Sequence, residues 1–422
     1  MRITILAAGS RGDIQPYLAL GVGLQAAGHR VRLAAFRNFA PLVEPYGLEF
    51  WPVDADFQAI MGGEDGQGMM SSSRNLAQLT RGISRTVGPI LQQLGDDFWR
   101  ACQGADLIFS GLNGVPFFGF EFAQKLGVPC INGCVVPLLS TRAWPNPMWP
   151  LRVNFGGAYN RFTHAMIARL GWQIFGRPIN AWRRETLGVP AISRADSFAQ
   201  IDRLPMAIGI SPHVIAKPPD WPVWYTLTGY WFLPRPIDWT PPADLARFLE
   251  AGEPPICFSF GSMSDANCDE ITHIVLAALK RLNRRGILVT AWGGLRSIEN
   301  SDQVYVIESV PFDWLWSQCA AVVHHGGSGS TGAGLRAGVP SLVVAFFADQ
   351  PFWGQRIFEL GCGPQPILRK QLTIERLAAA LDRAIHDPSL RAQAADLGRT
   401  IQTENGIAQA VAFIERTVAP HG

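Results

Sequence analysis

Short apolar runs alternate along the chain with longer stretches in which apolar residues recur at helical spacing. The runs that predict buried strands lie at 3–8, 31–35, 48–53, 106–110, 128–132, 205–210, 226–232, 255–260, 287–292, 304–307, 320–323 and 342–345. The stretches that predict helices lie at 17–27, 76–102, 268–282, 376–386 and 391–417. Such alternation is typical of parallel sheets covered by helices, so we expect an α/β protein with two Rossmann-like, doubly wound domains.

A proline-rich run at 233–242 separates the two series of strands and is the best candidate for a linker. The expected parts are an N-terminal domain over 1–235, a linker over 236–250, a C-terminal domain over 251–400 and a final segment over 401–422. We expect the last helix to return to the N-terminal domain. A stretch at 61–73, rich in Gly, Met and Ser, predicts a mobile loop.

Composition excludes several classes of protein. Of the 422 residues, 48% are hydrophobic and 17% are charged, so large cores can form and global disorder is excluded. A formal net charge of +2 argues against nucleic acid as a general partner. The seven cysteines show neither a disulfide framework nor a metal-binding CxxC pair. The N-terminus is typical of a core strand rather than a signal peptide, and no apolar run approaches a membrane span, so we expect a cytoplasmic protein.

The segment 122–184 contains no Asp or Glu, yet it carries one lysine and seven arginines interleaved with aromatic residues. A nucleic-acid surface is one interpretation, although no recognised fold supports it. A second is an amphipathic surface over 140–184 that touches anionic lipid and makes the protein peripheral to a membrane. A helical insertion that lines an apolar pocket, with its arginines in solvent, is the interpretation we favour.

The stretch 322–336 predicts a strand that breaks into glycines and hydroxyls and then becomes a helix. We expect this helix to begin near Ser330 or Thr331 and to end at Ala337, before a glycine and a proline. A strand–loop–helix junction presents free N–H groups and the positive end of the helix dipole, which suit a phosphate. His324 and His325 could each place an imidazole on a diphosphate. The alternative is a tight turn with a buried core histidine.

The loop at 9–16 follows the first strand and precedes the first helix. Asp13 lies at its tip, where a helix N-cap residue is expected. The loop lacks the GxGxxG pattern, and no acidic residue ends the second strand, so a nicotinamide-dependent oxidoreductase is disfavoured.

Three stretches together resemble the nucleotide-sugar glycosyltransferases of the GT-B fold, and most of all the sterol 3-β-glucosyltransferases. They are Gly-Ser-Arg-Gly-Asp-Ile-Gln-Pro at 9–16, His-His-Gly-Gly-Ser-Gly-Ser-Thr at 324–331 and Phe-Phe-Ala-Asp-Gln-Pro-Phe-Trp-Gly at 346–354. The chain is also similar to bacterial enzymes that glycosylate antibiotics and lipids. This resemblance covers nearly the whole chain and implies two domains that face each other across a cleft. The membrane-targeting domains of the fungal enzymes are absent, so we expect a free-standing bacterial catalytic unit.

The resemblance also assigns roles to residues. Asp13 falls where plant relatives carry a catalytic histidine, which makes it the expected base. Asp349 and Gln350 match the pair that binds sugar hydroxyls, and Trp292 or Val310 is expected at the nucleotide base. Residues expected at the donor diphosphate are Ser10, Arg11, Gly12, Gly261, Ser262, His324, Ser328, Gly329 and Ser330. No Asp-x-Asp appears where a metal-dependent transferase would need one, so the resemblance implies neither a metal nor a cofactor besides the nucleotide-sugar donor.

The function implied is an inverting, metal-independent transfer of a hexose from UDP-glucose to a hydroxyl of an apolar acceptor, such as a sterol or triterpenoid. A tryptophan-rich first domain agrees with an apolar acceptor, because aromatic walls bury flat ligands well. A TDP-deoxysugar as donor and a lipid or polyketide as acceptor remain alternatives. A non-catalytic protein that binds a nucleotide or carbohydrate is the alternative of another class.

Overall fold

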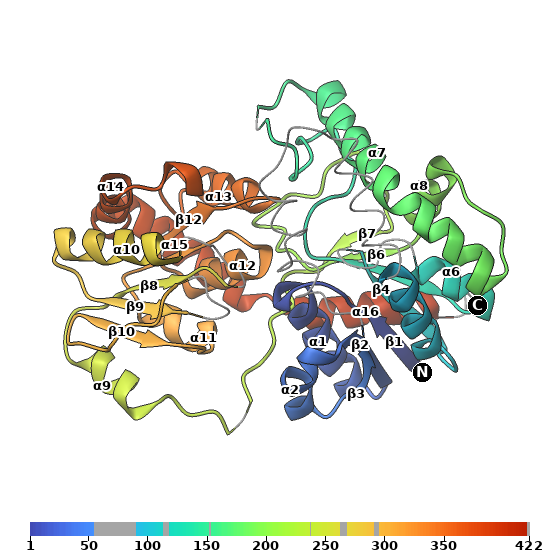
Figure 1. Ribbon diagram of the computed structural model, residues 1–422, viewed down its shortest axis with the longest axis horizontal. Helices are drawn as coiled ribbons and strands as arrows, with labels where there is room; N and C mark the ends of the chain where they lie inside the picture. The colour runs from blue at the N-terminus through green and yellow to red at the C-terminus, as the bar shows by residue number, and fades with distance from the viewer. Residues whose placement is uncertain are drawn as a thin grey trace. The chain divides into compact units, whose positions relative to one another are not determined.

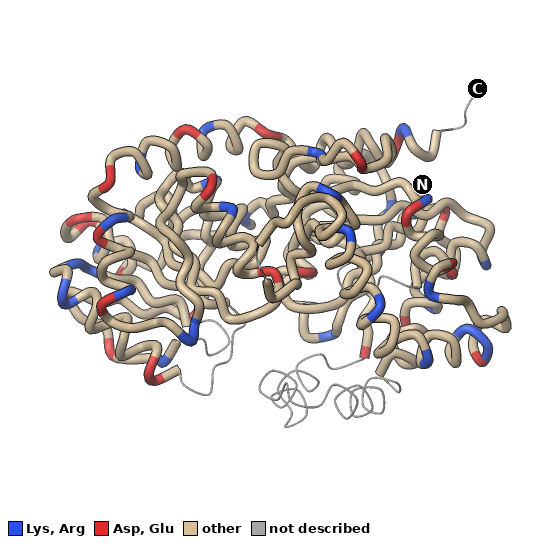
Figure 2. The backbone as a smooth tube through the Cα atoms, turned by 90° about the horizontal axis from the view of Figure 1, so that it is seen from above, with Lys and Arg blue, Asp and Glu red and all other residues tan. Residues whose placement is uncertain are grey.

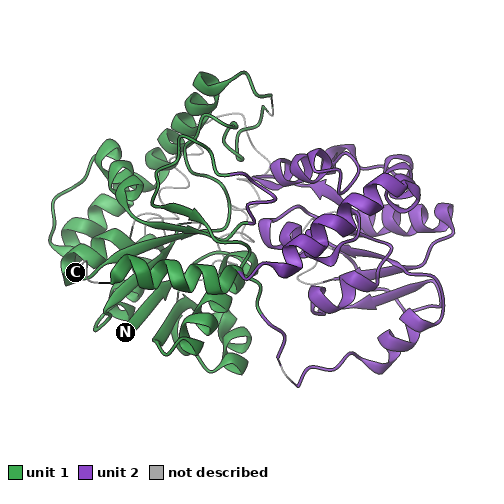
Figure 3. Ribbon diagram, turned by 180° about the vertical axis from the view of Figure 1, so that it is seen from behind, with its two compact units in different colours: residues 1–210, 217–233, 406–422 green, residues 211–216, 234–405 purple. Residues whose placement is uncertain are grey.

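The computed structural model describes residues 1–54, 90–112, 118–151, 153–236, 238–261, 268–290 and 295–419. The chain forms two compact units (Figure 3). Unit 1 comprises Met1–Ile210, Lys217–Leu233 and Gly406–Gly422, and unit 2 comprises Ser211–Ala216 and Pro234–Asn405. The chain therefore passes more than once between the units.

Unit 1 is built on a parallel sheet in the order β3-β2-β1-β4-β5-β6-β7 (Figure 1). Its strands are β1 (Arg2–Leu6), β2 (Arg30–Phe36), β3 (Glu49–Val53), β4 (Leu107–Gly111), β5 (Cys130–Cys134), β6 (Met206–Ile208) and β7 (Tyr225–Leu227). Its helices include α1 (Arg11–Ala26), α2 (Ala40–Val43), α6 (Gly119–Leu126), α7 (Gly157–Trp182), α8 (Arg194–Arg203) and α16 (Gly406–Val418), and residues 90–101 are also helical.

Unit 2 has a second parallel sheet in the order β10-β9-β8-β11-β12-β13. Its strands are β8 (Ile256–Ser259), β9 (Gly286–Val289), β10 (Val304–Ile307), β11 (Ala321–His324), β12 (Ser341–Ala345) and β13 (Ile367–Leu368). Its helices include α9 (Ala243–Glu250), α10 (Cys268–Leu282), α11 (Phe312–Leu315), α12 (Ser328–Ala337), α13 (Gln350–Glu359), α14 (Ile374–His386) and α15 (Pro388–Thr403).

Each sheet has one point at which the strand order reverses. In unit 1 this switch point lies between β1 and β4, which pair in the register Ile3↔Leu107. In unit 2 it lies between β8 and β11, which pair in the register Ser259↔His324. Open α/β sheets bind ligands at the carboxyl ends of the strands beside such a point. The topology therefore points to the loops after β1 and β4 in unit 1, and to those after β8 and β11 in unit 2.

The structure confirms two doubly wound domains and corrects several element boundaries. The bounds of α10 and β10 agree with the sequence-based prediction. Helix α1 begins at Arg11 rather than at residue 17, because Ser10 caps it and Pro16 is accommodated inside it. Strand β7 ends at Leu227 rather than at 232. The loop predicted at 61–73 and most of the helix predicted at 76–102 lie outside the described residues.

Two further corrections concern the basic segment and the C-terminus. Arg183, expected in solvent, is buried and forms an ion pair with buried Glu121. Burial raises the pKa of Glu121, and the guanidinium opposes that shift. The helix predicted over 391–417 is two helices, α15 and α16, since residues 404 and 405 interrupt it.

Charged side chains lie mostly on the helices, where Lys and Arg positions are interspersed with Asp and Glu positions in both units (Figure 2). The strands beneath them are largely apolar, which matches sheets buried on both faces. Among the described residues, no helix combines the length and the apolar character needed to cross a bilayer.

The start of helix α16 lies in close backbone contact with the loop that follows β7 in unit 1. The added Cβ of a residue larger than glycine at Gly406 would lie 2.3 Å from the carbonyl oxygen of Tyr230 and 2.6 Å from the carbonyl carbon of Gly229. Backbone atoms cannot yield as a side chain can, so this contact requires glycine.

We expect Gly406→Ala to destabilise unit 1 by about 1–3 kcal/mol, because the new methyl group overlaps backbone. Gly171→Ala in α7 is the matched control, since a Cβ there meets nothing within 4 Å. That variant should gain about 0.5–1 kcal/mol by losing the flexibility of glycine in a helix. Urea unfolding midpoints measure both effects, and equal midpoints for the two variants would contradict the predicted packing.

Candidate functional site

Two glycine turns lie side by side at the switch point of unit 2. The turn after β8 contains Gly261, which has a φ of +61°, and the turn after β11 contains Gly326 and Gly327. The ring of His325 lies between them, because a Cβ at Gly261 would be 2.9 Å from its Cε1 and a Cβ at Gly327 would be 2.5 Å from its Nε2. Only glycine leaves room for the imidazole at both positions.

The neighbouring histidine has a different environment. His324 is fully buried at the end of β11, and its Nδ1 accepts a hydrogen bond of 3.1 Å from the N–H of Gly326. This bond assigns the ring proton to Nε2, which has no hydrogen-bond partner among the described residues. Burial lowers the pKa of His324 to about 3 and that of His325 to about 4. Both rings are therefore neutral at physiological pH.

Helix α12 opens at this loop without a side-chain cap. It begins at Ser328, before the predicted start at Ser330 or Thr331, because the N–H of Thr331 already donates to Gly327 O at 2.8 Å. Its end at Ala337 is confirmed, with Gly338 in the left-handed conformation. Residues 328–330 thus form the first turn, whose N–H groups have no acceptor within the helix. An uncapped first turn and the helix dipole together favour an anion.

The predicted sugar-binding pair follows β12 and adjoins the same loop. A Cβ at Gly326 would lie 2.8 Å from the carbonyl oxygen of Gln350, so the two turns touch. The side-chain Oε1 of Gln350 accepts from the N–H groups of Phe346 (2.8 Å) and Phe347 (3.2 Å). The Oδ2 of Asp349 accepts from Trp353 Nε1 at 2.9 Å. Both side chains are held in place by their own turn and helix.

The remaining predicted residues of unit 2 are less informative. Val310 is buried and follows β10, at the carboxyl edge of the sheet. Ser262 and Trp292 lie outside the described residues. The structure thus brings together the turns that contain Gly261, Gly327 and Gln350.

In unit 1, Asp13 belongs to the first turn of α1 and not to the predicted N-cap, which is Ser10. The Oδ2 of Asp13 accepts from the backbone N–H of Ser10 at 2.8 Å and from its hydroxyl at 2.9 Å. A Cβ at Gly9 would lie 2.5 Å from the same oxygen, so the carboxylate lies over a glycine with a φ of +129°. The Nε of Arg11 donates to the Gln15 side chain at 3.0 Å. This is a capping box, and it fixes the position of the carboxylate.

An aromatic cluster lies one helical turn beyond Asp13. The ring of Tyr17 packs against Phe109 on β4 (6.2 Å) and Trp231 after β7 (5.7 Å). The Tyr17 hydroxyl donates to the carbonyl oxygen of Gly133 at 3.0 Å, and burial raises its pKa well above 10. Sequence reasoning missed this cluster, although the i, i+4 spacing of Asp13 and Tyr17 on one helix face was a usable signal.

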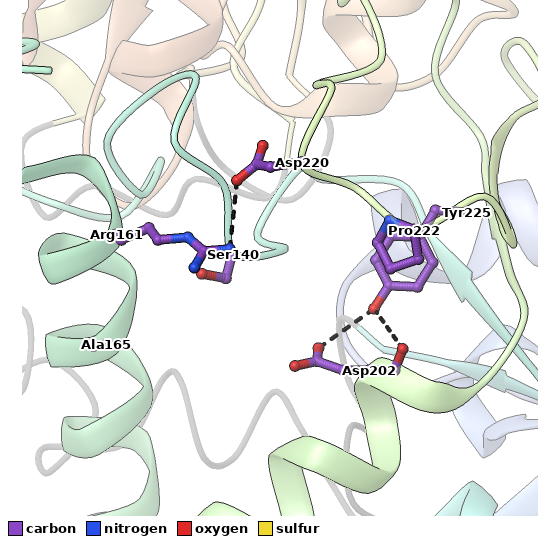
Figure 4. A pocket seen from close by; sticks show the side chains of 7 residues that line it. All are labelled: Ser140, Arg161, Ala165, Asp202, Asp220, Pro222 and Tyr225. Atoms are coloured by element: carbon purple, nitrogen blue, oxygen red, sulfur yellow. Dashed lines mark hydrogen bonds and ion pairs between the residues drawn. The ribbon is translucent and has the colours of Figure 1, made fainter. Parts of the chain in front are cut away.

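A cavity of about 420 Å³ lies elsewhere in unit 1 (Figure 4). Its lining is Ser140, Arg161, Ala165, Asp202, Asp220, Pro222 and Tyr225. The Tyr225 hydroxyl donates to Asp202 Oδ1 at 3.3 Å, and Arg161 lies 3.6 Å from Asp220. None of the sequence-predicted site residues lines this cavity, and its charged walls differ from the apolar pocket expected beside the basic segment.

Two domain families match the chain. Residues 3–96 match the family model of the glycosyltransferase family 28 N-terminal domain. Residues 274–411 match that of the erythromycin biosynthesis protein CIII-like C-terminal domain. Sterol 3-beta-glucosyltransferases from Emericella nidulans and Aspergillus terreus are 36% and 35% identical to the chain, each over 99% of it. The match takes in 30% of the length of each of these relatives.

Solved structures agree with the sequence matches. The glycotransferase of kitacinnamycin aligns over 99% of both chains with a TM-score of 0.71 and 22% identity. The Streptomyces sp. SF2575 glycosyltransferase SsfS6, complexed with thymidine diphosphate, aligns over 99% of both chains with a TM-score of 0.64 and 20% identity. The chain has the fold of the GT-B glycosyltransferases. The predicted fold and the predicted resemblance are both confirmed.

The buried histidines at the end of β11 predict how the stability of the protein responds to pH. As pH falls below about 6.5, the unfolded chain binds a proton that the buried His324 ring excludes in the folded state. The free energy of unfolding therefore decreases with falling pH, down to the folded pKa of about 3. The urea midpoint should therefore drop between about pH 7.5 and about pH 5. His324→Asn retains an acceptor for the Gly326 N–H but cannot titrate, so its drop should be smaller.

His273→Asn is the matched control, because His273 is exposed on α10 of the same unit. The urea midpoint of this variant should decrease with falling pH by as much as that of the wild type. An equal drop in all three proteins would show that His324 does not exclude a proton in the folded state.

Proposed function

We propose that the protein is an inverting glycosyltransferase that moves a hexose from UDP-glucose to a hydroxyl of an apolar acceptor such as a sterol, without a metal ion. The observation that carries the proposal is the pair of glycine turns beside the uncapped start of α12, at the switch point of unit 2. The names of the relatives support the transferase activity and the sterol acceptor.

The donor diphosphate fits the first turn of α12, where N–H groups and a helix dipole face the same space. His325 can add an Nε2–H or Nδ1–H donor as a neutral imidazole, and His324 holds the loop through Gly326. Further donor contacts are proposed from Gly261, Ser262, Ser328, Gly329 and Ser330, and from Arg11 and Gly12 at the start of α1. Ser10 contributes less to the diphosphate, because its N–H and hydroxyl already donate to Asp13.

The sugar and the base are assigned to the neighbouring turns. Asp349 and Gln350 would bind vicinal sugar hydroxyls, since a carboxylate accepts hydrogen bonds and an amide both donates and accepts them. Trp292 or the backbone at Val310 would meet the nucleotide base. These two assignments rest on the family pattern and on the placement of Gln350 beside Gly326.

Asp13 is proposed as the base. It would take the proton of the acceptor hydroxyl while that oxygen forms a bond to the anomeric carbon of the sugar. The bond from this carbon to the diphosphate breaks on the opposite side, and UDP leaves with the electron pair. Charge that develops on the leaving oxygen is stabilised by the donors at α12. Displacement from the opposite side inverts the anomeric centre.

A TDP-sugar is the second candidate donor. The favouring observation is the fold shared with SsfS6, whose structure contains thymidine diphosphate. One assay distinguishes the two donors. In it, UDP-glucose or TDP-glucose is offered with a sterol, with a flavonoid or with no acceptor.

We expect acceptor-dependent release of UDP by the wild type, and we expect Asp13→Asn to lower kcat by about 10²–10⁴ while UDP still binds. The amide can still accept from Ser10, so stability should change by about 1 kcal/mol or less. Product analysis by chromatography and a UDP titration measure these effects.

Asp196→Asn is the matched control. Asp196 lies three residues after the N-cap Ser193 of α8 and bonds its hydroxyl at 2.6 Å, as Asp13 bonds Ser10. This variant should keep the wild-type rate. If Asp13→Asn also keeps it, Asp13 is a helix-capping residue only and the base lies elsewhere.

His325→Ala should weaken UDP binding about ten-fold or more, since a hydrogen bond to a charged group contributes about 1.5–3 kcal/mol. Uridine is the matched ligand, because it lacks the diphosphate and should bind both proteins equally. Calorimetric titrations compare the four combinations. Equal losses of affinity for UDP and uridine would mean that His325 contacts the nucleotide base or only supports the loop.

A further inference from the structure

Large apolar side chains gather on one exposed surface of unit 1. Among the described residues nine such side chains are exposed, and six of them lie within residues 148–166. The six are Met148, Leu151, Val153, Phe155, Phe162 and Met166, here called the α7 apolar patch, and the other three are Met1, Val223 and Trp224. Phe155 and Phe162 are 66% and 52% exposed. Scattered apolar residues are normal on a surface, but a cluster this dense indicates an interaction site.

The patch is held on a rigid platform. The loop before α7 folds against the first turns of that helix (Figure 1). Trp149 packs edge-on against Phe162 at 6.1 Å, and its Nε1 donates to the Tyr159 hydroxyl at 3.0 Å. Phe155 packs against the same tyrosine at 5.0 Å. Tryptophan and tyrosine with a polar tip beside apolar neighbours are typical of a membrane–water interface.

Beneath the patch, polar side chains occupy the interior. Asn146, Asn160, Thr163 and His164 are all buried. The Asn146 N–H donates to Thr163 Oγ1 at 2.8 Å, and the Asn160 amide donates to the Arg142 carbonyl oxygen at 2.8 Å. Polar groups therefore fix the loop from inside while phenylalanines face out. In water this arrangement leaves apolar area unburied, and contact with an apolar medium would recover that free energy.

The charge around the patch selects among possible partners. The whole segment 122–184 lacks acidic residues, and the side chains of Arg142, Arg169 and Arg177 are exposed. Arg161 is also exposed but lies 3.6 Å from Asp220, which offsets part of its charge. A second copy of the chain would bring like charges together across a shared interface. An anionic bilayer offers both an apolar layer and negative headgroups.

We propose that the α7 apolar patch inserts into the headgroup region of an anionic lipid bilayer, with the neighbouring arginines on the lipid phosphates. This goes beyond the proposed transfer reaction, because no residue assigned to donor or base belongs to the patch. The sequence-based expectation of membrane contact over 140–184 is thereby narrowed to 148–166 and its flanking arginines.

Co-sedimentation of the full chain with vesicles tests the proposal. The vesicles contain either phosphatidylcholine alone or phosphatidylcholine mixed with phosphatidylglycerol, and neither a sterol nor a sugar donor is present. Wild type should prefer the mixed vesicles and lose binding as salt rises. The double variant Phe155→Ser, Phe162→Ser should bind about ten-fold more weakly, because two apolar side chains no longer enter the lipid.

Val223→Ser is the matched control, since Val223 is 86% exposed but lies outside the patch. It should bind as wild type does. The double variant Arg142→Gln, Arg169→Gln should lose the preference for the mixed vesicles. Unchanged thermal unfolding midpoints show that each variant is folded.

Three outcomes overturn the proposal. The first is binding of the phenylalanine variant equal to that of wild type, and the second is no binding of wild type to either vesicle. The third is a wild-type dimer in sedimentation equilibrium that the phenylalanine variant does not form, which makes a second copy the occupant. Because no donor or acceptor is present, the result does not depend on whether the proposed transfer occurs.

Discussion

The parallel pairing of β8 with β11 is the interaction on which the candidate donor site depends. It joins residues far apart in sequence in the register Ser259↔His324, so the turns after both strands emerge at the same edge of the sheet. The imidazole of His325 then fills the space above Gly261 and Gly327. The pairing therefore places both glycines against the same imidazole ring. In unit 1 the pair β1 and β4 repeats this topology, but the side chain after β1 at the corresponding edge is the carboxylate of Asp13.

The difference between the units lies at the helix that follows each switch-point strand. In α1 the positive end of the helix is satisfied from within the chain, by the carboxylate of Asp13 on Ser10. In α12 the N-cap is Gly327, which has no side chain to offer, so no side chain caps the positive end of this helix. One fold thus provides a fixed carboxylate in one unit and, in the other, the turn that we propose for the donor diphosphate. An inverting displacement needs both functions: a base that takes the proton of the acceptor, and hydrogen-bond donors that stabilise the charge on the leaving group.

Sequence periodicity predicted what depends on local pattern. The strands β10 and β11 and the helix α10 follow from apolar runs and helical spacing. It failed at the starts of α1 and α12, because hydrogen bonds from Ser10 and Thr331 extend each helix into residues that a glycine-rich pattern assigns to a loop. Local pattern also could not separate two adjacent histidines. His324 ends β11 and His325 follows it, and only the packed structure shows that His325 lies against the glycine turns.

The two units are proposed to meet different partners. The proposed nucleotide-sugar donor is soluble in water and would reach unit 2 by diffusion, whereas the proposed sterol-like acceptor partitions into bilayers. The α7 apolar patch and Asp13 belong to the same unit, so the unit proposed to activate the acceptor also carries the surface proposed to meet the lipid that contains it. Sequence composition pointed to this segment but not to its orientation. That depended on buried Asn146 and Asn160, whose hydrogen bonds hold the loop from within and leave its phenylalanines outside.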